Sequence, residues 1–290
     1  MKTFVLISTL FATSICWSQP QQIIKPTNAP KIPVNNQAVL VKKADDPFYK
    51  FSFYSELSYT VQSEKLADGS RPESSGFYIM PKLNIGDYSV KGEFSYAYDL
   101  KNPSVGNDWD DGRVTFSRKS WELGDLIKLA PTLYFDLPLS KESRENRGIQ
   151  LITNPGFLLS LNNKTTGWDN LTLTYAINYG FFTNQYTTKA NGDVATKNRL
   201  TQVLTGRYKY KKFTFAEIFS FYSSYSYEDV VRNSFKHIDV INYSLTDTIE
   251  LGIAHCNGPA PLLKANTYEN NLRFYSQETS QYGISIGITI

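Results

Sequence analysis

The residues of this sequence that could do acid–base or metal chemistry fall into three short stretches. The two histidines lie in His237–Asp239 and in His255–Gly258, and the densest acidic cluster is Asn107–Gly112. Oxygen ligands at this spacing can hold a hard cation such as calcium, but the full spacing of a calcium-binding loop is absent. We therefore expect a solvated loop at 107–112 and polar wall or loop residues at both histidines.

Sequence motifs of the common soluble enzyme classes are missing. We find no glycine-rich loop that could cradle a phosphate, no zinc-ligand spacing and no nucleophile elbow. We therefore predict no catalytic residue, no metal site and no cofactor.

The elements that would position these residues are clearest at the C-terminus. In Tyr282–Ile290, bulky apolar residues take every second position, and small or weakly polar residues take the others. Since side chains on a strand point to alternate faces, this strand has one apolar wall and one thin, polar wall. A strand in a membrane barrel needs this division, with lipid on one side and a lumen on the other.

The N-terminal residues predict export. Residues 1–18 combine Lys2 with a short apolar run, which is typical of a secretory signal. Residues 19–47 carry five of the 13 prolines and no alternation, so we expect an extended periplasmic tether. Cys16 would leave with the signal, so Cys256 would be the one cysteine of the mature chain and no internal disulfide is expected.

The composition narrows the class of protein. No later stretch is long and apolar enough for a membrane helix, and the mean hydropathy is −0.34. Either a soluble secreted protein or a membrane barrel fits these values, because only alternate residues of a barrel face lipid. The aromatic content of 14%, with 20 Tyr and 18 Phe, favours the barrel.

The net charge of +3 comes from the N-terminal segment. Residues 1–47 hold five basic and two acidic residues, so the totals of 30 and 27 leave 25 of each sign in residues 48–290. A neutral remainder does not indicate a surface that binds nucleic acid.

The alternation returns along residues 48–290 in about twelve strands, with ten or fourteen as limits. We expect strands near residues 48–60, 77–85, 90–99, 113–121, 127–137, 149–161, 171–181, 200–208, 213–225, 235–245, 249–253 and 282–290. The fourth strand is weak and the tenth has no clean alternation. Glu217 falls on an apolar row, which suggests a bulge or a register error there. Residues 256–276 give no clear pattern.

The connections alternate between long and short, which is typical of a barrel with extended loops outside and tight turns inside. We therefore predict an all-β fold, a transmembrane antiparallel up-and-down β-barrel over residues 48–290. A soluble β-sandwich also has alternating strands. It would not need Tyr and Phe so often at strand ends, where they fit an interfacial girdle.

Residues 48–290, with the signal and the last strand, resemble bacterial outer-membrane β-barrel proteins of the porin or small-transporter type. This resemblance implies the outer membrane of a Gram-negative bacterium and passive passage of small solutes through the lumen. Its partners would be outer-membrane lipid, lipopolysaccharide and the barrel-assembly machinery. Many members end in Phe, whereas this chain ends in Ile290, so the usual assembly signal is imperfect.

Charged residues on the polar rows would line the pore. We predict that these are Lys50, Glu56, Lys82, Lys91, Glu93, Arg113, Lys119, Lys128, Asp136, Arg207 and Glu250. Their modest basic excess would give a weak preference for anions in a water-filled lumen. The alternative is that these charges pair across the lumen and plug it.

Two other functions stay open. A plugged barrel could act through its loops, as a structural or surface-recognition protein. A barrel with a hydrolase site at its rim is the other possibility, although His237 precedes Asp239, opposite to the order in omptin proteases. Outer-membrane phospholipases and lipid A deacylases have a His-x-Ser motif, but Asn257 stands where their serine nucleophile would be.

Overall fold

The computed structural model describes residues 49–65, 69–101, 108–261, 274–277 and 279–290. The predicted signal, residues 1–18, and the predicted tether, residues 19–47, lie outside these ranges. None of the helices in the described ranges is long and apolar enough to cross a membrane.

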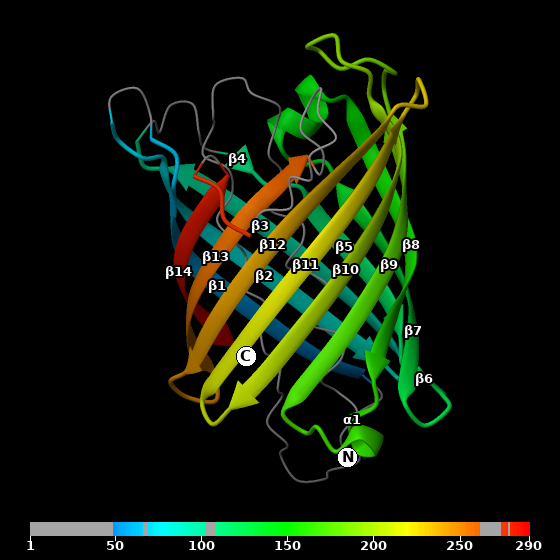
Figure 1. Cartoon of the computed structure of the whole chain (residues 1–290), viewed down its shortest axis with the longest axis vertical. Helices are drawn as coiled ribbons and strands as arrows, with labels where there is room; N and C mark the ends of the chain where they lie inside the picture. Colours follow the sequence, from blue (N-terminus) through cyan, green and yellow to red (C-terminus); the bar gives the residue numbers. More distant parts are fainter. Residues whose placement is uncertain (1–48, 66–68, 102–107, 262–273, 278) are drawn as a thin grey trace.

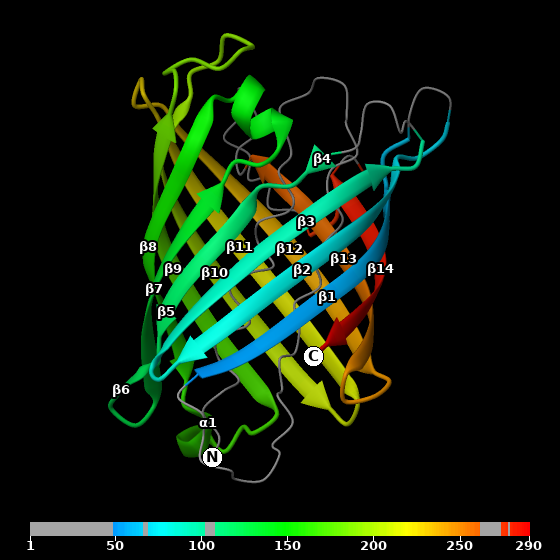
Figure 2. The ribbon, with the colours of Figure 1, turned by 180° about the vertical axis from the view of Figure 1, so that it is seen from behind.

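The described residues form one antiparallel sheet that closes on itself (Figures 1 and 2). Its strands are β1 (Tyr49–Gln62), β2 (Glu73–Ile85), β3 (Tyr88–Asp99), β4 (Asp108–Trp109), β5 (Gly112–Arg118), β6 (Trp121–Leu123), β7 (Ile127–Leu137), β8 (Ile149–Leu161), β9 (Leu171–Asn184), β10 (Thr196–Tyr210), β11 (Phe213–Ser226), β12 (Val231–Ser244), β13 (Ile249–Pro261) and β14 (Ser280–Thr289). Two single helical turns, η2 (Glu142–Asn146) and α1 (Asn163–Thr166), lie in connections.

The expected count of twelve barrel strands is confirmed for the part of the chain that the structure describes. The short strands β4 and β5 both pair with β3, while β5 and β6 both pair with β7. These three pieces therefore share one position in the wall. Their interruption explains why the sequence pattern is weak near residues 113–121.

The barrel closes where β1 meets β14. Nine residue pairs join them in an unbroken antiparallel register, from Tyr54–Thr289 to Gln62–Gln281. Phe53 and the terminal Ile290 then exchange two backbone hydrogen bonds of 3.0 and 2.8 Å. The first and last strands thus satisfy each other's backbone groups, so neither leaves an open sheet edge.

Alternation in the sequence becomes two faces in the barrel. In β14, Ile284, Ile286 and Ile288 are exposed, whereas the alternate positions Gly283 and Gly287 are buried. The same exchange of exposed and buried positions runs through β3, β7 and β9. Because the sheet is closed, the exposed row is the outer face and the buried row is the inner face.

Of the bulge and the register error suggested at Glu217, neither is present. The registers of β11 with β10 and with β12 run through this residue without a break. Glu217 therefore lies on the outer face by ordinary alternation. Irregularities occur instead between Thr196 and Asn198, between Phe235 and His237, and between Ile149 and Leu151.

The pattern that the sequence left open after residue 255 is partly resolved. Strand β13 continues to Pro261, and residues 262–273 lie outside the described ranges. The predicted lack of an internal disulfide concerns a chain without residues 1–18, which lie outside the described ranges.

Glycines on the inner face make room for large polar side chains beside the closing strands. Gly287 of β14 lies between Glu56 of β1 and Glu250 of β13 in the register. The ring of Tyr54 occupies the space above it, where a Cβ on Gly287 would fall inside contact distance of the Tyr54 ring and hydroxyl. The closing seam therefore depends on a small residue at 287.

We predict that Gly287→Ala destabilises the barrel by about 1–3 kcal/mol, because the added methyl group overpacks the space held by Tyr54. The measurement is the temperature at which the folded form, seen by its faster migration on gels, is lost in detergent. The control is Gly206→Ala, where the new Cβ would meet the Leu173 methyl at an ordinary 3.5 Å. Equal melting of the two variants would contradict the packing described for the seam.

Candidate pore and its charged wall

The predicted pore residues do not all occupy one kind of position. Eight of them are buried at inner-face positions of the strands: Glu56, Lys82, Lys91, Glu93, Arg113, Lys128, Asp136 and Arg207. Glu250 is partly buried on the inner row of β13. Lys50 is exposed near the start of β1.

Lys119 lies outside the pore wall. Strand β5 ends at Arg118, and the Lys119 side chain is 61% exposed in the turn region, 3.8 Å from the Asp87 carboxylate. The alternation of β5 continued by one residue would have pointed Lys119 inward, but the strand ends before that residue. Lys119 is therefore a surface residue at the end of the barrel that carries the short turns.

A row of alternating charge crosses three neighbouring wall positions. Glu93 of β3 lies opposite Arg113 of β5, and Arg113 lies opposite Asp136 of β7. The Arg113 Nε donates to Asp136 Oδ1 at 2.6 Å, and the guanidinium packs 4.1 Å from the centre of the Tyr134 ring. Asn154 donates to the other Asp136 oxygen at 3.1 Å. Both oxygens of this buried carboxylate are therefore satisfied by neighbours in the wall.

Two tyrosines that were not predicted from the sequence hold the acidic residues of the first strands. Tyr54 donates to Glu56 at 2.7 Å and lies 3.5 Å from a carboxylate oxygen of Glu250. Tyr78 donates to Glu93 at 2.7 Å, and Lys91 is 3.3 Å from the second oxygen of Glu93. Tyrosines at inward positions of a strand are a signal that could have revealed these contacts.

The basic residues gather next to this row. Lys82 of β2 lies directly opposite Lys91 of β3 on the inner face.

At the other end of the barrel, burial and the charge of Arg199 lower the pKa of Arg147, in the connection after η2, to about 10. Arg199 and the buried Lys236 were not predicted, because the alternation is weak where β10 begins and in β12.

The opposite part of the inner face is apolar. A continuous cluster of buried side chains runs over β7 to β13: Ala130, Leu158, Ala176, Val203, Ala216, Ile218, Ile238, Val240, Ala254 and Cys256. The inner wall therefore has a charged arc over β1 to β7 and a largely apolar arc over β7 to β13. Only the charged arc was anticipated from the sequence.

The acidic loop is held by a neighbouring connection. Asp111 accepts hydrogen bonds from the Ser140 and Ser143 hydroxyls, and Asp108 accepts one of 2.7 Å from the Lys141 backbone N–H. These contacts tie 108–112 to the connection between β7 and β8. The two carboxylates therefore hold the acidic loop against the connection between β7 and β8.

The histidines do not lie at the rim of the barrel. His237 is in the middle of β12, on the outer row, and His255 is on the outer row of β13. Their described polar partners are Glu217, Asp239 and Ser280, and the acidic loop is not among them. The arrangement expected of a rim hydrolase is therefore not formed by these residues.

We predict that Asp136→Asn destabilises the folded barrel by about 3–5 kcal/mol, because it leaves the buried Arg113 charge without its counter-ion. The control is Lys119→Gln, which breaks an exposed pair and should change stability by less than about 1 kcal/mol. Urea titration of the folded form in lipid vesicles measures both values. Similar losses in the two variants would contradict a buried, satisfied Arg113–Asp136 pair.

Comparisons with known proteins agree with the barrel fold. No known family model matches the sequence, and no curated protein sequence matches it. Among solved structures, the NanC porin matches with a TM-score of 0.51 and 14% identity, over 81% of this chain and 98% of that chain. An outer-membrane channel from Pseudomonas putida F1 matches with a TM-score of 0.51 and 9% identity, over 86% and 100% of the two chains. The chain therefore has the closed β-barrel fold found in outer-membrane channels.

Proposed function

We propose that the protein is an outer-membrane channel that lets small solutes pass through its lumen. The observation that carries this proposal is that charged side chains of the inner face pair with neighbours along the wall. Lys91 pairs with Glu93 on the same strand, and Arg113 pairs with Asp136 on the adjacent barrel strand. Charges that pair along the wall do not have to bridge the lumen, and this kind of pairing is what a passage for water and solute requires.

The outer face supports a location in the membrane. Its strands expose Leu, Ile and Phe side chains, and aromatic residues gather near the short turns, including Tyr88, Trp121, Tyr210 and Phe213. An apolar band with an aromatic girdle is what the lipid and headgroup regions of a bilayer require. Outer-membrane lipid, lipopolysaccharide and the barrel-assembly machinery are the partners that this location implies.

A weak preference for anions is part of the proposal. The buried charges of the described residues are nearly balanced, with Lys82, Lys91, Arg113, Lys128, Arg207 and Lys236 against Glu56, Glu93, Asp99, Asp110 and Asp136. The place on the inner wall that would favour anions is the one where Lys82 of β2 lies directly opposite Lys91 of β3, because two basic side chains are neighbours there. Neighbouring fixed charges of one sign bias ion passage toward the opposite sign.

We predict that Lys82→Glu lowers the ratio of chloride to potassium permeability, because it places a negative charge where two lysines meet. The reversal potential in a potassium chloride gradient measures this ratio across a planar bilayer. The matched control is Lys119→Glu, which makes the same charge change at an exposed site outside the pore wall. An unchanged ratio in Lys82→Glu, or an equal shift in both variants, would contradict the proposed role of the Lys82–Lys91 pair.

Solute passage is tested separately by swelling of vesicles that contain the full chain. We expect the swelling rate to fall as the size of an uncharged sugar increases, since a fixed pore sieves by size. Vesicles that hold the folded barrel but swell no faster than empty vesicles would contradict the channel. They would favour the alternative of a plugged barrel that works through its loops.

A further inference from the structure

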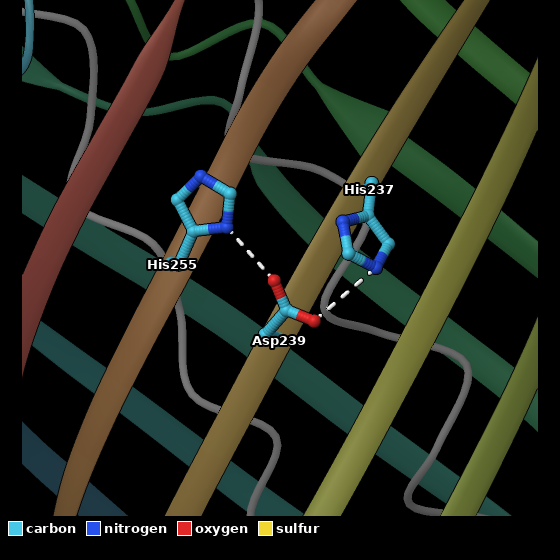
Figure 3. A group of neighbouring side chains, drawn as sticks. All are labelled: His237, Asp239 and His255. Carbon is cyan, nitrogen blue, oxygen red and sulfur yellow. Dashed lines mark hydrogen bonds and ion pairs between the residues drawn. The ribbon is translucent and has the colours of Figure 1, made fainter. Parts of the chain in front are cut away.

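Four side chains that could bind a metal meet on the outer face of the barrel. Glu217 of β11 lies opposite Asp239 of β12, and Asp239 lies opposite His255 of β13. His237 is two residues before Asp239 and therefore points to the same face. Figure 3 shows Asp239 between the two imidazole rings. Three adjacent strands thus bring together two imidazoles and two carboxylates.

The donor atoms are already close to one another. His237 Nε2 is 2.7 Å from Glu217 Oε2 and 3.2 Å from Asp239 Oδ1. His255 Nδ1 is 2.8 Å from Asp239 Oδ2. One donor atom each from His237, Asp239 and His255 all lie within 4.8 Å of one another. Zinc takes nitrogen and oxygen ligands at about 2.0–2.2 Å in tetrahedral geometry, which sets its ligand atoms about 3.4 Å apart, so the hydrogen-bonded pairs would have to separate by less than about 1 Å to bind it.

The surroundings make a counter-charge necessary. His237 stacks on Phe219 at 5.0 Å between ring centres, and Phe274 meets it edge-on at 5.1 Å. The ring of Tyr282 is tilted against that of His255, with 5.1 Å between the ring centres. Two carboxylates on an apolar, lipid-facing surface are unfavourable unless a positive charge neutralises them. A divalent cation with two neutral imidazoles and two carboxylates gives a neutral site.

We propose that Glu217, His237, Asp239 and His255 form a binding site for a divalent transition-metal ion of the zinc class. The ligand set of two imidazoles and two carboxylates suits such an ion better than calcium or magnesium, which prefer oxygen ligands alone. The ion would join β11, β12 and β13 on the outside of the barrel. The site does not depend on the channel, because none of its residues belongs to the inner wall.

A second contact fits the metal site. His255 Nε2 is 3.1 Å from Ser280 Oγ, and a histidine that binds a metal through one ring nitrogen usually donates from the other. Ser280 Oγ also accepts the Ser276 backbone N–H at 3.0 Å. The metal ligand His255 is therefore oriented by the residue with which β14 begins.

Ser280, His255 and Asp239 also have the spacing of a nucleophile, a base and an orienting acid. A serine hydrolase at this place is disfavoured, because a substrate would have to reach the Ser280 hydroxyl and Ser280 is only 1% exposed. In addition, Asp239 is shared between two histidines rather than serving one. The metal site uses all four side chains, whereas the hydrolase would leave Glu217 and His237 without a role.

The test uses the full chain, purified in detergent and stripped with EDTA, and titrated with Co²⁺ and then Zn²⁺. We expect one Co²⁺ per chain, with the strong visible absorption of a tetrahedral site, and displacement of this Co²⁺ by Zn²⁺. His255→Gln and Asp239→Asn should each weaken binding by about 100-fold or more, since loss of a ligand costs at least as much as loss of its supporting partner. Zn²⁺ should also raise the melting temperature of the native chain.

The matched control is Gln202→Ala, which removes a polar side chain from the outer row of β10, away from the cluster. It should bind Co²⁺ as the native chain does. Absence of stoichiometric binding, or equal binding by His255→Gln and the native chain, would overturn the proposal. Labelling of Ser280 by a fluorophosphonate, lost in Ser280→Ala, would also overturn it and would identify a serine nucleophile instead.

Discussion

The pairing of the first strand with the last is the constraint on which the rest of the structure depends. Backbone N–H and C=O groups have no water to bind in the hydrocarbon core of a membrane, so a sheet there cannot keep an open edge. The nine-residue register of β1 with β14, and the two hydrogen bonds between Phe53 and Ile290, remove that edge. Closure also gives the sheet an inner and an outer face, so that alternate side chains of each strand point to different surroundings.

Both proposed sites follow from that division. On the inner face, neighbouring strands present Glu93, Arg113 and Asp136 as a row that neutralises itself along the wall. On the outer face, the same kind of direct register brings Glu217, Asp239 and His255 together among apolar neighbours. The first arrangement neutralises charge within the inner wall of the barrel. The second arrangement places two carboxylates on a lipid-facing surface, where negative charge is unfavourable unless a cation neutralises it.

Much of the architecture could be predicted because period-two alternation is a local signal. The strict alternation of Leu171–Phe181 and of Tyr282–Ile290 indicated the outer rows of β9 and β14 directly. Alternation failed where a strand is interrupted, as in β4, β5 and β6. It also failed at Lys119, because the pattern does not tell where β5 ends.

The contacts between strands could not be predicted in the same way. They depend on register, and a pattern with period two is the same after a shift of two residues. The hydrogen bond from Tyr78 to Glu93 and the meeting of His237 with Glu217 are of this kind. The proposed metal ligands come from three strands, so no short sequence motif with zinc-ligand spacing indicates them. Glu217 did stand out as a charge on an apolar row, although its explanation is a cluster rather than a bulge.

The measurement that tests the central claim most directly is single-channel conductance of the full chain in a planar bilayer. The result predicted by wall-paired charges around a water-filled lumen is a series of steady, reproducible conductance steps. The contradictory result is a barrel that is folded and inserted, as shown by faster migration on gels and protection from protease, yet conducts no current. That outcome would mean that the lumen is closed.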